Sequence, residues 1–115
     1  MDKLETAVTS GDIRKVAQQI VDSFHPQKVI LFGSFAYGTA TGDSDVDFLV
    51  VMETNENPMH MAGLISAAID HPFPLDIIVM TPSRLEEYLN EKAVFATNLL
   101  TKGIVLYEAG DSGVD

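Results

Sequence analysis

Residues 31–49 of this 115-residue chain read LFGSFAYGTATGDSDVDFL. The first two residues end an apolar, β-branched run over Lys28–Phe32, which predicts a short buried strand that stops at a glycine. A polar, glycine-rich stretch over Gly33–Ser44 follows, and Asp45–Met52 predicts a second strand that is apolar on both faces beyond its second aspartate. Strands that are buried on both faces need helices against the sheet, so this stretch favours an α/β fold.

An amphipathic helix is predicted before the first strand. Ser10 is a favourable N-cap, and apolar residues recur after it at the spacing of one helical face. The pair His25-Pro26 ends the helix, because the residue before a proline avoids helical geometry. The apolar stripe consists of Ile13, Val16, Ala17, Ile20, Val21 and Phe24.

The second half of the chain continues the alternation of helices and strands. A helical stripe covers Met61–Ile69, and Phe73–Met80 predicts a third strand. A further helix is expected from Thr81-Pro82 to Leu100, followed by a short strand over Ile104–Tyr107. The expected order is α-β-α-β-α-β-α-β, which predicts a small mixed α/β sandwich.

Length and composition restrict the class of protein. The chain is long enough for one domain over residues 1–115, and we expect the stretches 1–9 and 109–115 to be mobile tails. A hydrophobic content of 46% argues against disorder, and the lack of cysteine excludes disulfides and thiolate zinc sites. No signal-peptide pattern is visible, and no apolar run approaches the roughly 20 residues of a membrane-spanning helix. We therefore expect a cytoplasmic protein without a membrane role.

The charge of the chain constrains its partners. Seventeen acidic residues oppose seven basic ones, for a formal net charge of −10. Such a surface repels phosphate backbones, so we expect no direct binding of nucleic acid and an acceptor that is a protein or a small molecule. The alternative is that the acidity only aids solubility.

The Gly33-Ser34 pair after the first strand is a candidate phosphate cradle. Gly33 has no Cβ, so a ligand can approach the backbone closely, and Ser34 adds a hydroxyl at the expected start of a short helix. The alternative is an ordinary strand-to-helix turn.

Three aspartates are candidate metal ligands. Asp45 and Asp47 are two residues apart at the start of a strand, which directs both carboxylates to one face. Asp76 interrupts the apolar run of the third strand, where a buried charge needs a partner, and no arginine or lysine is near it in sequence. Hard oxygen ligands of this kind suit Mg²⁺. For the first two aspartates the alternative is a polar turn at a strand entrance.

These residues together resemble the polymerase-β-like nucleotidyltransferase superfamily, whose signature is Gly-Ser, ten residues and Asp-x-Asp. The small size resembles the minimal nucleotidyltransferase (MNT) subfamily, and the resemblance extends to the sequence KGIVLYE at residues 102–108. It implies a palm-like mixed sheet flanked by helices, and transfer of a nucleoside monophosphate, AMP from ATP, with two Mg²⁺ ions. The implied site residues are Gly33, Ser34 and Ser44 for the nucleotide, and Asp45, Asp47 and Asp76 for catalysis and metal.

The resemblance also implies a partner. Members of this size resemble MNT antitoxins, which silence HEPN-type toxins, in some cases by adenylylating a toxin tyrosine. The chain departs from the family pattern at Tyr37, where many members have an arginine before the glycine that closes the loop. Two alternatives stay open: a transferase that acts on a small molecule with a partner subunit, and a non-catalytic module that neutralises its partner by contact.

Overall fold

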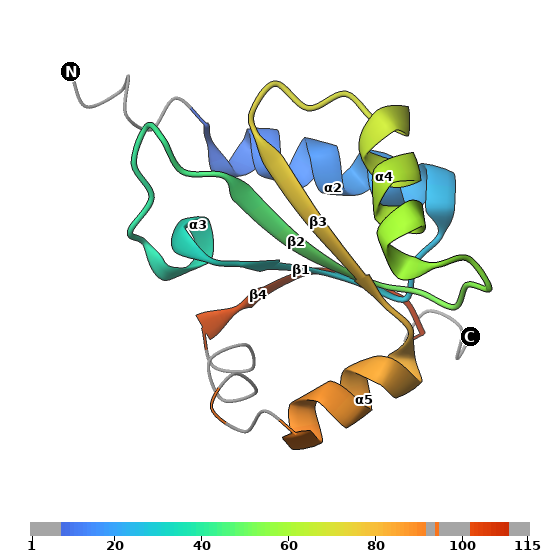
Figure 1. Ribbon diagram of the computed structural model, residues 1–115. Helices are drawn as coiled ribbons and strands as arrows, with labels where there is room; N and C mark the ends of the chain where they lie inside the picture. Colours follow the sequence, from blue (N-terminus) through green and yellow to red (C-terminus); the bar gives the residue numbers. More distant parts are fainter. Residues whose placement is uncertain (1–7, 92–93, 95–101, 111–115) are drawn as a thin grey trace.

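The computed structural model describes residues 8–91, 94 and 102–110. Within this part of the chain the elements follow the predicted order (Figure 1). The last helix was predicted to continue to Leu100, but its part after Glu91 lies outside the described residues except for position 94. Most of the tails that we expected to be mobile also lie outside the described residues. In chain order the elements are α2 (Ser10–Phe24), β1 (Lys28–Phe32), α3 (Ser34–Tyr37), β2 (Val46–Val51), α4 (Pro58–Ala68), β3 (Leu75–Met80), α5 (Pro82–Glu91) and β4 (Ile104–Glu108).

The strands form one mixed sheet in the order β3-β2-β1-β4. β1 runs antiparallel to both of its neighbours, β2 and β4, whereas β3 runs parallel to β2. The parallel pair requires a crossover, and α4 forms part of it (Figure 1). The mixed sheet flanked by helices confirms the α/β prediction.

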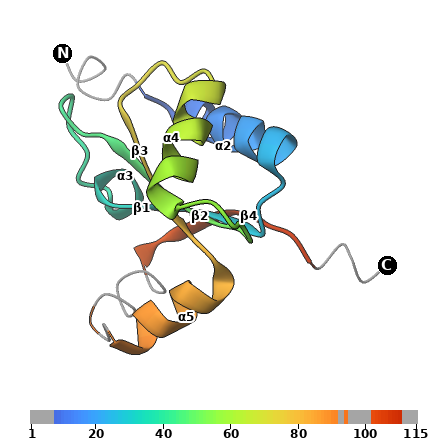
Figure 2. The same cartoon turned by 45° about the vertical axis from the view of Figure 1, so that its right-hand side comes forward.

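Helices cover the two faces of the sheet unequally. α2 and α4 lie on one face and α5 lies on the other (Figures 1 and 2). The face under α2 and α4 carries the main core, in which Phe48 and Val50 are fully buried. The opposite face carries a small cluster of three buried residues, packed against Leu85 and Leu89 of α5. These three are Ile30, Leu49 and Val51.

The start of α2 differs by one residue from the prediction. Thr9, not Ser10, is the N-cap, because its hydroxyl accepts a hydrogen bond from the Asp12 backbone N–H at 3.0 Å. The Asp12 carboxylate accepts in return from the Thr9 N–H at 3.0 Å, which completes a capping box. His25 ends the helix as predicted, in a left-handed conformation with φ 53°.

Two other boundaries also shift. α4 begins at Pro58, three residues before the predicted stripe, and the Asn57 side chain caps it by accepting from the backbone N–H of Met59 at 2.8 Å. β3 begins at Leu75, because Pro74 has no N–H to donate to a ladder, although Phe73 is still buried in the core. None of the helices in the described part of the chain is both long and apolar enough to cross a bilayer.

Candidate active site

The end of β1 makes a sharp turn at Gly33. This residue has φ 77°, a left-handed value that favours glycine, and α3 begins directly after it at Ser34. The Gly33 carbonyl oxygen accepts hydrogen bonds from the N–H groups of Ala36 and Tyr37, each at 3.0 Å. Gly38, at φ 83°, closes the turn by donating its N–H to the Ser34 carbonyl oxygen. The predicted Gly-Ser loop is therefore a compact single turn at the end of the strand.

Glycine is favoured at position 33 for a second reason, which is the proximity of Asp47. The antiparallel register of β1 and β2 places Asp47 opposite Phe32, next to Gly33. A Cβ atom on Gly33 would overlap the Asp47 carboxylate oxygen Oδ2. We expected a ligand to approach the backbone at Gly33. The Asp47 carboxylate already occupies part of that space, so the turn at Gly33 and β2 are in direct contact.

The parallel register of β2 and β3 places Asp76 beside Asp47. Residues paired in this way point to the same face of a sheet, here the face that α5 covers in part. The pKa of the Asp47 carboxyl is raised from its ordinary value, first by burial, then by the negative charge of Asp76, and then by that of Asp45. Asp76 and Asp45 therefore each lie within electrostatic range of Asp47.

The surroundings of Asp76 differ from the prediction. β3 is an edge strand rather than a buried one, and Asp76 is exposed, as is Ile78 with 43% of its surface accessible. The sequence argument that burial forces a partner on Asp76 was therefore wrong. The strand pairing with Asp47, rather than burial, is what relates Asp76 to the other carboxylates.

Ser44 lies in the turn that leads to Asp45. Its hydroxyl oxygen accepts a hydrogen bond from the Thr41 backbone N–H at 2.8 Å, and its own N–H donates to the Thr41 carbonyl oxygen at 3.1 Å. These bonds shape the loop before β2 and so orient Asp45. A direct contact of Ser44 with nucleotide stays a prediction.

The carboxylates suit an open magnesium site rather than a closed cage. Within residues 8–91, 94 and 102–110, no three acidic or histidine side chains are close enough together to enclose an ion as they stand. Burial and then the negative charges of Asp76 and Asp45 raise the pKa of the Asp47 carboxyl, so a bound cation would favour its charged form. Mg²⁺ commonly uses only one or two carboxylates and completes its shell with water and substrate phosphates. The donor set of Asp45, Asp47 and Asp76 fits that chemistry.

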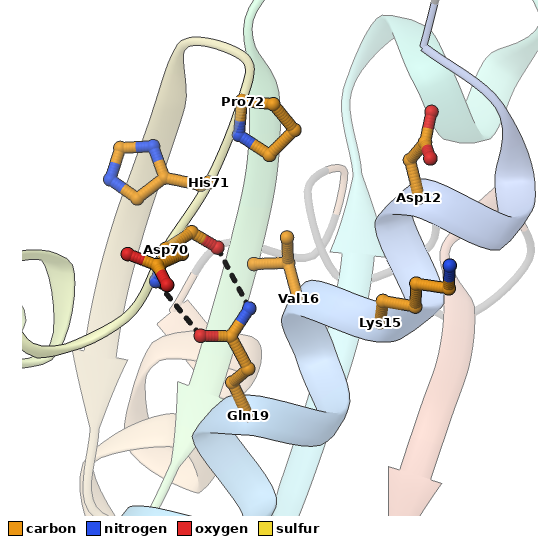
Figure 3. A pocket seen from close by; sticks show the side chains of 7 residues that line it. All are labelled: Asp12, Lys15, Val16, Gln19, Asp70, His71 and Pro72. Carbon is orange, nitrogen blue, oxygen red and sulfur yellow. Dashed lines mark hydrogen bonds between the residues drawn. The ribbon is translucent and has the colours of Figure 1, made fainter.

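A pocket of about 460 Å³ lies away from these residues, between α2 and the loop before β3 (Figure 3). Gln19 of α2 forms two hydrogen bonds with the backbone of Asp70, one to its carbonyl oxygen and one from its N–H, each at 2.8 Å. Val16 and Pro72 also line this pocket. Because the loop leads into β3, this pair of bonds helps to fix the strand that carries Asp76.

The histidines lie apart from the aspartates. His25 caps α2, and His71 has its Nδ1 atom 3.0 Å from the Phe73 carbonyl oxygen. His60 lies 3.9 Å from Glu56 on an exposed part of α4.

Solved structures with the same fold include a nucleotidyltransferase and toxin–antitoxin complexes. A Sulfolobus solfataricus protein classed as a nucleotidyltransferase aligns with a TM-score of 0.60 at 19% identity, over 86% of this chain and 79% of that one. A toxin–antitoxin complex with AMP-PNP aligns with a TM-score of 0.53 at 22% identity, over 91% and 77%. The MntA–HepT toxin–antitoxin complex aligns with a TM-score of 0.50 at 19% identity, over 90% and 76%.

At these identities the structural matches show the fold. No curated protein matches the chain. The model of the nucleotidyltransferase domain family matches residues 13–105, which include the Gly33-Ser34 turn and all three aspartates. The chain belongs to the nucleotidyltransferase domain family.

Proposed function

We propose that this protein is a Mg²⁺-dependent nucleotidyltransferase that transfers AMP from ATP to a tyrosine of a HEPN-type toxin and so acts as an antitoxin in the cytoplasm. One observation carries the enzymatic part of the proposal. Asp47 is adjacent to the Gly33 turn through one strand pairing and to Asp76 through the other. The turn proposed to bind phosphate and the carboxylates proposed to bind metal are therefore adjacent.

The proposed roles follow from these positions. Gly33 and Ser34 bind the triphosphate, and Asp45, Asp47 and Asp76 hold two Mg²⁺ ions. Bound Mg²⁺ supplies charge neutralisation for the triphosphate and activation of the attacking hydroxyl. The acceptor oxygen forms a new bond to the α-phosphorus while the bond to the β-phosphate oxygen breaks, which releases pyrophosphate and the hydroxyl proton. The chain contributes mainly position and electrostatics, as is usual for phosphoryl transfer.

Three observations support a toxin as the partner. The similar solved structures include toxin–antitoxin complexes, one of them with AMP-PNP. The net charge of −10 favours association with a basic protein, because complementary charges speed encounter and exclude other partners. Ile78 adds exposed apolar surface two residues from Asp76, on a strand at the edge of the sheet.

Intact-mass spectrometry of the co-expressed pair tests the proposal. We expect the toxin to gain one or more AMP units with the wild-type protein and none with Asp45→Asn or Asp47→Asn. Asp43→Asn is the matched control, since it removes the same charge from the exposed loop just before these residues and should leave the modification intact.

A second function remains in competition because of Tyr37, which replaces the arginine of many relatives. A protein that neutralises its partner by contact alone would silence the toxin without added mass, and Asp45→Asn and Asp47→Asn would silence it equally well. That result would reject the enzymatic proposal. A small-molecule acceptor would instead appear as a labelled small product from α-labelled ATP.

A further inference from the structure

Lys102 lies beside the Gly33 turn although it is distant in sequence. Antiparallel pairing places Ile104 at the start of β4 opposite Leu31 near the end of β1. The residues that precede Ile104 therefore continue toward Phe32 and Gly33. In Figures 1 and 2 the start of β4 is close to α3. The Lys102 ammonium nitrogen lies 5.7 Å from the centre of the Tyr37 ring, a cation–π contact.

Tyr37 belongs to the turn that holds Gly33. Its backbone N–H donates to the Gly33 carbonyl oxygen at 3.0 Å, so the residue that carries the ring is part of this turn. Tyr37 is 39% exposed and Lys102 is exposed as well. The ammonium group is therefore at the surface, next to the turn, on a flexible stem that can reach an anion bound there.

The other described basic residues are engaged or located elsewhere. Lys28 pairs with Glu108 at 3.6 Å, at the far end of β1 from Gly33. Arg84 pairs with Glu87 on α5 at 3.4 Å. Lys15 lies on α2 and lines the pocket beside Asp70. Arg14 also lies on α2, where it lines a small pocket together with Phe35 of α3. Lys102 is thus the cation for which the structure records a contact with the Gly33–Gly38 turn, and Arg14 is its rival.

We propose that Lys102 binds the polyphosphate of the nucleotide and that the Tyr37 ring positions its ammonium group. This inference rests on the proposed nucleotidyltransferase function. A nucleoside triphosphate brings several negative charges to a surface that already contains three carboxylates, so a cation at the turn lowers the repulsion. Many relatives place an arginine in the loop itself. In this chain an aromatic side chain takes that position and the neighbouring strand brings the cation.

Calorimetric titration of the full chain with ATP and with AMP, each in the presence of Mg²⁺, tests the inference. We expect Lys102→Gln to weaken ATP binding about tenfold, as for loss of one charge-assisted hydrogen bond, with a much smaller effect on AMP. The dependence of ATP affinity on salt should become shallower. Lys102→Arg should retain most of the affinity. Tyr37→Phe should bind as wild type because it keeps the ring, whereas Tyr37→Leu should weaken ATP binding.

Two matched variants control for the change in net charge. Lys28→Gln removes an equivalent lysine from the other end of β1 and should bind ATP as wild type. Arg14→Gln tests the rival cation. The double variant Lys102→Gln/Tyr37→Arg should recover affinity by returning a cation to the loop, and circular dichroism melting curves verify that each variant is folded.

The outcomes separate this inference from the function on which it rests. If the wild-type protein binds ATP but Lys102→Gln and Lys28→Gln both bind it equally well, Lys102 has no role and the proposed function stands. A loss of ATP affinity confined to Arg14→Gln assigns the role to that residue instead and overturns the inference. If the wild-type protein binds no nucleoside triphosphate in the presence of Mg²⁺, the proposed function fails and the inference fails with it.

Discussion

The two faces of the sheet are made by the same strands but have different roles. Along β2, Phe48 and Val50 face α2 and α4 in a continuous core. Leu49 and Val51 face α5 in a cluster of only three buried residues, and Asp47 extends that row toward the turn at Gly33. The face that α2 and α4 cover, called the closed face below, supplies stability. The face that α5 covers in part, called the open face below, leaves charged side chains accessible.

This difference shows how alternation along one strand can separate folding from chemistry. Carboxylates on the closed face would be buried without partners, at a cost of several kcal/mol each. At the uncovered end of the other face, solvent and bound cations can stabilise Asp45, Asp47 and Asp76. The open face is therefore where a metal-dependent site is compatible with a stable domain.

The largest expected effect contrasts an aromatic residue of the closed face with an aliphatic residue of the open one. Phe48→Ala should lower the free energy of unfolding by about 3–5 kcal/mol, because Phe48 is fully buried and its removal leaves a cavity. Ile78→Ala should cost less than about 1 kcal/mol, since Ile78 is 43% exposed. Urea unfolding measures both. Equal losses would show that the open face is also packed in the folded protein.

A smaller effect is expected at Gly33, where the turn after β1 meets Asp47 of β2. Gly33→Ala should destabilise the protein by about 1–3 kcal/mol, through backbone strain at φ 77° and overlap with Asp47. Gly38→Ala is the matched control, because Gly38 has a similar φ of 83° but open space around its Cα. Gly33→Ala should cost more than Gly38→Ala. The excess should disappear when Asp47→Gly is combined with each variant, and an unchanged excess would contradict the assigned contact.

The smallest effect concerns the dependence of stability on pH. The raised pKa of Asp47 means that the folded state disfavours its charged form. Without Mg²⁺, the wild-type protein should lose stability relative to Asp47→Asn as pH rises through this raised pKa. Below the ordinary carboxyl pKa of about 3.9, where the group is protonated in both states, this ionisation penalty is absent.

Thermal melting between about pH 3 and pH 7 measures this effect. Added Mg²⁺ should raise the melting temperature of the wild type more than that of Asp47→Asn. If the difference in stability between the wild-type protein and Asp47→Asn stayed constant across this pH range, that result would contradict the electrostatic picture of the site.

The strands and the fold class were predictable because the apolar runs are compact and separated by clear turn residues. The order of the strands was not, since periodicity describes one strand at a time. This limit explains the error at Asp76, whose apolar neighbours suggested a buried strand although β3 lies at the edge of the sheet. The identity of the N-cap could have been found, because Thr9 has Asp12 three residues later whereas Ser10 has Ile13.

In the candidate site, too, features within one stretch of sequence were predictable, whereas contacts between distant strands were not. Gly33, Asp45 and Asp47 were predicted as site residues from their spacing within one short stretch. Nothing in the spacing pointed to Lys102, because only the pairing of β1 with β4 brings it to the turn. The contact between Gly33 and Asp47 was also missed, since it depends on the register of two strands.

The parallel pairing of β3 with β2 affects the order in which the site is assembled during folding. β1 and β2 are close in sequence, so their antiparallel pairing brings Gly33 and Asp47 together with a short loop to close. Asp76 joins them only after the crossover through α4, and parallel pairing across such a connection is intrinsically slower. We therefore expect the three carboxylates of the candidate site to come together only when the sheet is complete.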